Sequence, residues 1–398
     1  MKNRLLSQNQ NLNQLSYGFA LLFIAIGSIL QYITPYFYAQ GKEDMGFKIL
    51  ILLNGCIFLA NFIAPYFIRR YGSQKMIVVT AVAYIVSIVA MIMNNTYVVY
   101  GGTVLLGIAG AILWNSQNNY LVGISQAHNR GANSGFFVAV YGVGYALGIF
   151  VLGYLIEIFS YQNAFFMMLL FAFGGVYLFA QMDTLEGELG EKNSASIFSI
   201  RSITLLESVL TSSFIQAILF GVVISLVPLH VQMVTQSSVL VGMLSAMFFI
   251  VPLLLSVPIG KFSDKNGRGK VMLAGIIIAL LGLWAFHLAQ TLFGLVVGMV
   301  ALSIAQAILF PMLIAIQGDL STSENQALVT NLFVLFKYIG MVLGVMLGDI
   351  FGVEWAYLIT IFIIVAVLLF SFRVLLDEEE VRDRVFEEMG LGNKRSEQ

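Results

Sequence analysis

The chain has 398 residues, of which 59% are hydrophobic and only 10% are charged, whereas soluble domains average about 25% charged residues. A water-soluble fold of this length could not bury so much apolar side chain, so the composition indicates an integral membrane protein. The formal net charge of -1 at pH 7 gives no indication of nucleic-acid binding. The single cysteine, Cys56, excludes an intrachain disulfide.

Twelve apolar stretches are long enough to cross a membrane, because a helix needs roughly 20 apolar residues to span about 30 Å of hydrocarbon. In chain order, the predicted spans are 15–38, 46–68, 76–94, 97–124, 135–158, 162–182, 205–232, 237–259, 271–290, 292–318, 327–351 and 354–375. The apolar stretch from Leu15 is too long for a cleaved signal peptide, so we expect it to be retained as a span.

A polar segment that begins at Asp183 separates the sixth predicted span from the seventh. The predicted divisions are an N-terminal six-helix bundle (1–182), a linker (183–204), a C-terminal six-helix bundle (205–375) and a tail (376–398). Lysine and arginine concentrate in the segments on the side of the linker, whereas Lys42 and Lys48 fall on the other side. By the positive-inside rule, we expect the linker and both termini to be cytoplasmic.

The two predicted bundles repeat each other at an offset of about half the chain. The run Ile108–Trp114 matches Ile304–Phe310, and a pair of glycines four residues apart recurs at the same offset, as Gly144 and Gly148 and then Gly340 and Gly344. A repeat of this length is typical of membrane transporters built from two parallel halves related by an axis along the membrane normal. The sequence therefore predicts two pseudo-symmetric bundles.

The loop after the eighth predicted span begins at Gly260 and reads G-K-F-S-D-K-N-G-R-G-K. It resembles the loop signature of the major facilitator superfamily, G-x-x-x-D-[RK]-x-G-[RK]-x-[RK], and the resemblance covers nearly the whole chain. This implies the major facilitator fold, an all-α membrane protein with twelve transmembrane helices in two six-helix bundles. It also implies that Gly260, Asp264, Gly267 and Arg268 form a conformational latch; the alternative is a basic loop that only sets the topology.

The corresponding loop of the first half departs from the signature. Arg69 occupies the position of the carboxylate, and Pro65 occupies that of the first glycine. We expect this loop to anchor the topology without acting as a latch.

Polar side chains within the predicted spans are candidates for solute binding, because polar groups are costly in the membrane and usually face a cavity. The span 97–124 contains the amide-rich run W-N-S-Q-N-N-Y from Trp114. Within it, Asn115 and Asn118 share one helix face. Amides at these positions suit a neutral or zwitterionic solute, whereas the alternative is bonding to neighbouring helices.

In the major facilitator superfamily, the first, fourth, seventh and tenth helices line the central cavity. The resemblance therefore adds three glutamines as substrate-binding candidates: Gln31, Gln216 and Gln306. For each glutamine, interhelical packing is the alternative.

Lys337 is a charged residue deep within a predicted span. At about 1.5 Å per residue, ten residues from Ala327 place it about 15 Å deep, near the middle of a hydrocarbon layer of about 30 Å. It is a candidate anchor for a carboxylate or phosphate of the solute, or a switchable charge; the alternative is a fixed bond to Asn54 or to another group of the second predicted span. Its counterpart in the first half is Tyr141.

The sequence lacks the residues that enzymes and ATP-driven pumps require. It has no G-K-[ST] phosphate loop, and its three histidines match no metal-binding spacing. We therefore expect no catalysis, no cofactor and no metal site. The sequence has no obvious carboxylate in the middle of a span. It therefore does not decide between coupling to a proton, coupling to a sodium ion and facilitated diffusion.

Together these features predict a monomeric, multi-pass carrier of the cell membrane, in contact with the lipid bilayer, that moves a small organic solute by alternating access. The alternative is a non-transporting protein of the same fold that regulates another membrane protein. Some members of the superfamily regulate ion channels. Their degenerate first loop resembles the loop of this chain around Arg69. Their W-x-x-Q-x-N-Y run resembles this chain from Trp114 to Tyr120.

Overall fold

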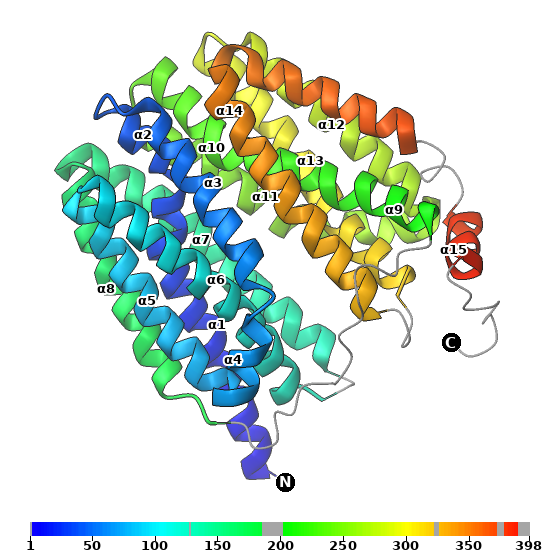
Figure 1. Ribbon diagram of the computed structural model, residues 1–398, viewed down its shortest axis with the longest axis horizontal. Helices are drawn as coiled ribbons and strands as arrows, with labels where there is room; N and C mark the ends of the chain where they lie inside the picture. The colour runs from blue at the N-terminus through cyan, green and yellow to red at the C-terminus, as the bar shows by residue number, and fades with distance from the viewer. Residues whose placement is uncertain (1, 127–128, 185–201, 322–325, 372–377, 389–398) are drawn as a thin grey trace. The chain divides into compact units, whose positions relative to one another are not determined.

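The computed structural model describes residues 2–126, 129–184, 202–321, 326–371 and 378–388, and in these ranges it contains helices and no strand (Figure 1). The helices of the first part of the chain are α1 (Lys2–Gln31), α2 (Ile33–Tyr38), α3 (Glu43–Ala60), α4 (Ala64–Tyr71), α5 (Ser73–Met93), α6 (Thr96–Ile124), α7 (Arg130–Phe159) and α8 (Tyr161–Ala180). Those of the second part are α9 (Ile203–Val209), the π-helix η2 (Leu210–Phe214), α10 (Ile215–Thr235), α11 (Ser238–Asn266), α12 (Arg268–Leu288), α13 (Leu292–Asp319), α14 (Gln326–Ser371) and α15 (Glu378–Glu388). The predicted all-α class is confirmed.

The lengths of these helices agree with a multi-pass membrane protein. Ten helical stretches are long and apolar enough to cross a membrane, and the bent pair of α3 and α4 adds an eleventh. α14 is 46 residues long and is interrupted at Gly352 (φ 61°, ψ -172°), so it contains the last two predicted spans. The described helices therefore agree with twelve predicted crossings, except that residues 372–375 lie outside the described residues.

Two predicted spans are broken, and a proline follows each break. Pro35 has no N–H to donate to the carbonyl of Gln31, so the helix is interrupted at Tyr32, between α1 and α2. The second break follows Asn61, and α3 and α4 meet there at 58°. Pro65, in the first turn of α4, suits a helix start because its missing N–H would have no partner there.

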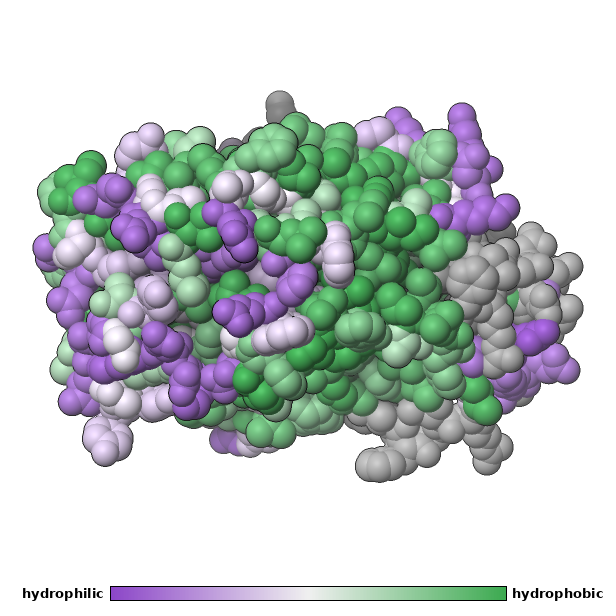
Figure 2. Space-filling model, turned by 90° about the horizontal axis from the view of Figure 1, so that it is seen from above, coloured by the Kyte–Doolittle hydropathy of each residue, from purple (hydrophilic) through white to green (hydrophobic). Residues whose placement is uncertain are grey.

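Exposed apolar side chains identify the surfaces that face lipid. On α5 they recur every three or four residues, at Val79, Val82, Val86, Val89 and Met93. This spacing forms one stripe on a helix, while the rest of α5 packs against α6 and α8. Figure 2 shows apolar residues over a broad area in the middle of the view, with hydrophilic residues gathered at the left and again at the right. In water such a surface would be unfavourable, so the protein is an integral membrane protein.

The chain forms two compact units. The first comprises Met1–Glu191 and Val227–Ile250, and the second comprises Lys192–Leu226 and Val251–Gln398. The end of α10 and the beginning of α11 thus belong to the first unit. Most of the predicted linker, residues 185–201, lies outside the described residues, and of the predicted tail only α15 is described.

The repeated glycines make equivalent contacts in the two units. A Cβ atom on Gly148 of α7 would lie 2.5 Å from the carbonyl oxygen of Ile24 in α1. A Cβ atom on Gly344 of α14 would lie 2.4 Å from the carbonyl oxygen of Ile218 in α10. The internal repeat therefore marks two pairs of helices whose backbones meet without a side chain between them.

We expect Gly148→Ala to destabilise the protein strongly, because the added methyl group would displace the backbone of α1. Overpacking of this kind costs about 1 to 3 kcal/mol. Gly135→Ala is a matched control in the same helix, since its Cβ atom would meet nothing within 4 Å. Thermal unfolding of the two purified variants in detergent gives their melting temperatures. Equal melting temperatures would contradict the close approach of α7 to the backbone of α1.

Candidate functional site

The predicted latch forms the turn between α11 and α12. Gly267 has φ 90° and ψ 133°, a conformation that residues with a side chain rarely adopt. The turn places Arg268 at the first position of α12 and Asp264 one turn earlier on α11. Gly260, one turn before Asp264, accepts a hydrogen bond from the Ser263 hydroxyl at 2.7 Å.

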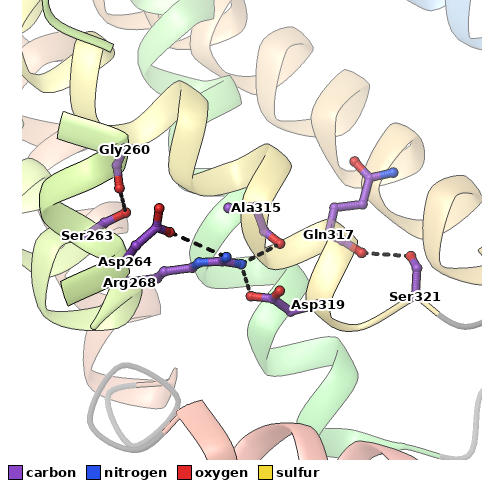
Figure 3. A network of polar contacts seen from close by, with 8 residues as sticks. All are labelled: Gly260, Ser263, Asp264, Arg268, Ala315, Gln317, Asp319 and Ser321. Atoms are coloured by element: carbon purple, nitrogen blue, oxygen red, sulfur yellow. Dashed lines mark hydrogen bonds and ion pairs between the residues drawn. The ribbon is translucent and has the colours of Figure 1, made fainter. Parts of the chain in front are cut away.

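Arg268 is the centre of a polar network that joins three helix ends (Figure 3). Its Nη2 lies 3.6 Å from Oδ1 of Asp264. Its Nη1 donates to the carbonyl oxygen of Ala315 at 3.1 Å and pairs with Asp319, the last residue of α13. A cation at this position also complements the negative end of the α13 dipole. The network therefore fixes the end of α13 against the turn between α11 and α12.

Asp319 is a functional candidate that the sequence analysis missed. The side chain of Asp264 is 63% exposed, whereas that of Asp319 is 45% exposed and that of Arg268 is 25% exposed. Asp319 is thus the better shielded acid, and it forms an ion pair with Arg268. Its position at the end of a predicted span was visible in the sequence, but its proximity to Arg268 depends on how α12 and α13 pack.

Two predicted glutamines meet in the second unit. Nε2 of Gln216 on α10 donates to Oε1 of Gln306 on α13 at 3.2 Å, and both residues are buried. Buried amides are stable when they are hydrogen-bonded, so this pair links the two helices. Gln31 is buried at the end of α1 in the first unit.

Lys337 is exposed on α14, between two positions that contact η2. The Phe333 carbonyl oxygen accepts from the Ser213 hydroxyl at 2.8 Å, and Gly340 packs against the backbone of Phe214. The Nζ atom of Lys337 lies 5.6 Å from the ring centroid of Tyr338, and in the described part of the chain no carboxylate or carbonyl oxygen binds this atom.

Asn54, the alternative partner predicted for Lys337, donates from its amide nitrogen to the carbonyl oxygen of Leu50 at 2.8 Å. The amide is therefore satisfied within its own helix.

The two asparagines predicted on α6 have different surroundings. Nδ2 of Asn115 donates to Oδ1 of Asn61 at 2.8 Å and to the carbonyl oxygen of Ala111 at 2.8 Å. Asn61 in turn donates to the Ile57 carbonyl oxygen and lies at the break between α3 and α4. Asn115 therefore supports this break, whereas Asn118 is exposed.

We expect the two asparagines to respond differently to alanine. Asn115→Ala should lower stability by about 1 to 3 kcal/mol, because it leaves a polar group of Asn61 without its partner. Asn118→Ala should weaken solute binding while it leaves the melting temperature unchanged. Thermal unfolding and ligand titration separate the two effects, and equal stability loss in both variants would assign both residues to packing.

Aromatic rings gather beside Asn115 in the first unit. Trp114 and Tyr141 lie 5.5 Å apart between ring centroids, and Phe23 lies 5.4 Å from Trp114 and 5.0 Å from Tyr141. Phe19 completes the group, 5.5 Å from Trp114. The sequence analysis missed both phenylalanines, because an apolar helix gives no signal for which ring faces its neighbours. At Tyr141, the position equivalent to Lys337, the first unit thus presents aromatic rings packed edge to face.

A second polar contact of the first unit ties α11 to α1 and α7. Oε2 of Glu157 accepts from the backbone N–H of Ser238 at 2.9 Å, and the Tyr32 hydroxyl donates to the Ser238 carbonyl oxygen at 2.8 Å. Cβ atoms on Gly153 and Gly242 would lie 2.5 and 2.6 Å from that hydroxyl oxygen. The carboxylate of Glu157 lies at the start of α11, where the helix dipole favours a negative charge.

Comparison with known proteins agrees with the helical membrane fold. A sequence profile described as Major Facilitator Superfamily matches residues 15–238 and 209–394. Protein unc-93 homolog A from Bos taurus is 32% identical over 125 residues, which are 31% of this chain and 27% of that protein. UNC93-like protein MFSD11 from Xenopus tropicalis is 28% identical over 133 residues, which are 33% of this chain and 30% of that protein. The chain therefore matches less than a third of the length of these relatives.

Solved structures match over a much larger part of the chain. The peptide transporter POT, crystallised in complex with sulfate, superposes with a TM-score of 0.79. The match covers 94% of this chain and 95% of that chain at 12% identity. At this identity the likeness shows the fold and leaves the solute open.

Proposed function

Because the chain belongs to the major facilitator superfamily, we propose that it is a secondary transporter, which moves a small organic solute across the membrane by alternating access. The observation that carries this proposal is the intact loop between α11 and α12, where Arg268 joins the ends of α11, α12 and α13. A carrier that alternates between two states needs helix ends that can be held and released. A network of exposed and half-buried charges at helix ends suits that task.

The proposed solute carries an anionic group and hydrogen-bonding groups. Lys337 offers a positive charge without a bound acid among the described residues. Gln216 and Gln306 lie in the same unit and offer amide groups. A lysine ammonium binds carboxylate and phosphate oxygens, so both kinds of anionic solute fit the proposal.

We further propose that the protein works as a monomer in the cell membrane, with both termini in the cytoplasm and without an enzymatic activity or cofactor. The driving force is a proton gradient, a sodium gradient or the solute gradient itself. The described residues contain no cluster of three or more His, Cys, Asp or Glu side chains that could hold a metal ion.

A second candidate is a non-transporting protein that acts on another membrane protein. The first unit supports it, because Arg69, in the last turn of α4, takes the position that Asp264 has in the second unit. There Arg69 donates to the carbonyl oxygen of Pro65 at 3.3 Å, and Arg70 donates to the Tyr66 hydroxyl at 3.1 Å. The likeness to the UNC93-named relatives concerns only part of each chain.

A thermal-shift screen of the purified protein against metabolites tests the proposed function. A ligand at 100 times its dissociation constant adds about 2.7 kcal/mol to the apparent stability, which is readily measured. Uptake of the labelled ligands into liposomes containing the protein should follow. A stable protein partner in a pulldown, together with no uptake of any binding ligand, would favour the second candidate.

A further inference from the structure

The helix α15 is docked on the start of α9 in the second unit (Figure 1). Oε2 of Glu388 accepts from the Ser202 hydroxyl at 2.6 Å and from the backbone N–H of Thr204 at 3.2 Å. Its Oε1 accepts from the Thr204 hydroxyl at 2.9 Å. One carboxylate therefore binds three donors at the point where a membrane-spanning helical stretch begins.

This contact caps a long helical stretch. α9, η2 and α10 continue from Ile203 to Thr235 as one apolar stretch. Ser202 is its N-cap, since its hydroxyl oxygen accepts from the backbone N–H of Leu205 at 3.0 Å. Glu388 adds a negative charge at the positive end of this stretch, where charge-assisted hydrogen bonds are strongest.

Apolar contacts hold the other side of α15. Val385 is fully buried in a cluster to which α9, α13 and α14 contribute. The α9 members of that cluster are Leu205 and Val209, and Leu332 and Phe333 come from α14. α15 is therefore fixed both by the carboxylate of Glu388 and by an inserted valine.

The π-helix η2 follows α9 directly and depends on the same contacts. The hydrogen bonds of a π-helix span five residues, one more than those of an α-helix, and π-helical turns are frequent at functional sites. Within η2, the Ser213 hydroxyl donates to the Phe333 carbonyl oxygen at 2.8 Å, and the Thr211 hydroxyl donates to Ser371. Both acceptors lie on α14, and Phe333 also belongs to the cluster that buries Val385.

We propose that α15 is a conformational strap, which fixes α9 and thereby holds η2 in its π-helical form against α14. When the strap is docked, Glu388 and Val385 prevent α9 from sliding along its axis. When the strap is released, α9 can move and η2 can return to an α-helical register, which withdraws Ser213 from Phe333. Since Lys337 lies one turn after Phe333, the strap would act on the face of α14 that carries the proposed solute anchor. This last step rests on the proposed function, whereas the effect on η2 does not.

Hydrogen exchange of the purified full-length protein tests the strap without a transport assay. In Glu388→Ala, amides of residues 203–214 should exchange at least about tenfold faster than in the unchanged protein, because opening of a local segment governs their exchange. Glu387→Ala is the matched control, since it removes the same charge from the same turn, and neither Ser202 nor Thr204 bonds to Glu387 among the described residues. Exchange in α5 should be unchanged in both variants.

A second variant removes the apolar contact of α15 and keeps the carboxylate of Glu388. Val385→Asp should release α15 from the apolar cluster and produce the same acceleration in residues 203–214. Unchanged exchange there in both Glu388→Ala and Val385→Asp, or equal acceleration in Glu387→Ala, would overturn the strap. Faster exchange spread evenly over α5 as well would also overturn it, because it would show general destabilisation.

Discussion

Lys337→Met should strongly reduce the transport of anionic solutes and leave the protein folded. Lys337 is exposed, and its nearest ring contact is with its neighbour Tyr338. Removal of a charge without a bound acid costs little stability. Loss of a charged hydrogen-bonding partner for the solute costs about 1.5 to 3 kcal/mol, so the solute affinity should fall about tenfold or more. Uptake into liposomes and ligand-induced thermal shifts measure the two effects.

Two further variants control this result. Lys337→Tyr copies the counterpart Tyr141 and should also lose anionic solutes, since a phenol carries no positive charge. Lys42→Met removes an exposed lysine from the loop before α3 and should leave transport intact. Full transport by Lys337→Met between pH 5 and 8, at unchanged stability, would show that Lys337 does not bind the solute.

Asp319→Asn should lower the transport rate more than Asp264→Asn does. Asp319 is the less exposed of the two acids that pair with Arg268, with its side chain 45% exposed against 63% for Asp264. We expect Asp319→Asn to slow transport about tenfold, equivalent to about 1.4 kcal/mol. The effect of Asp264→Asn should be severalfold smaller, because exposed ion pairs contribute about 0 to 1 kcal/mol. Initial uptake rates, normalised to the amount of folded protein, provide the comparison.

Exchange of the two charges offers a stringent control for the latch. Arg268→Asp alone should lose transport, and combination with Asp319→Arg should restore part of it if the pair itself matters. The reverse order, in which Asp264→Asn is the more harmful change, would contradict the assignment of Asp319 as the main partner. Equal transport by all variants would show that the loop only sets the topology.

The sequence was sufficient for the all-α class and for most of the predicted spans, because length and apolar composition alone determine which segments can cross a membrane. The repeated glycines also predicted close helix contacts, which Gly148 and Gly344 make. The break at Tyr32 could have been expected from Pro35, since a proline removes one helical donor. The break at Asn61 could not, because it depends on Asn115 of a different helix.

The candidate site was predicted less completely than the fold. Gln216 and Gln306 were named separately, and only the packing of α10 against α13 shows that they bond to each other. Asp319 and Glu157 could be recognised in the sequence as acids near helix ends. The sequence alone does not show which other helix end each of these acids contacts. Residues 376–398 were predicted only as a tail, whereas Glu388 of α15 binds the start of α9 through groups 184 and 186 residues away.

Solute counterflow with purified protein in liposomes tests the proposed transport function most directly. Liposomes are loaded with an excess of an unlabelled solute from the thermal-shift screen, and entry of the labelled solute is followed without any ion gradient. A carrier with alternating access should accumulate the label transiently above its external concentration, and Lys337→Met should not if the solute is anionic. Specific binding of the solute without counterflow, in liposomes whose protein is folded and inserted, would contradict a role as a transporter.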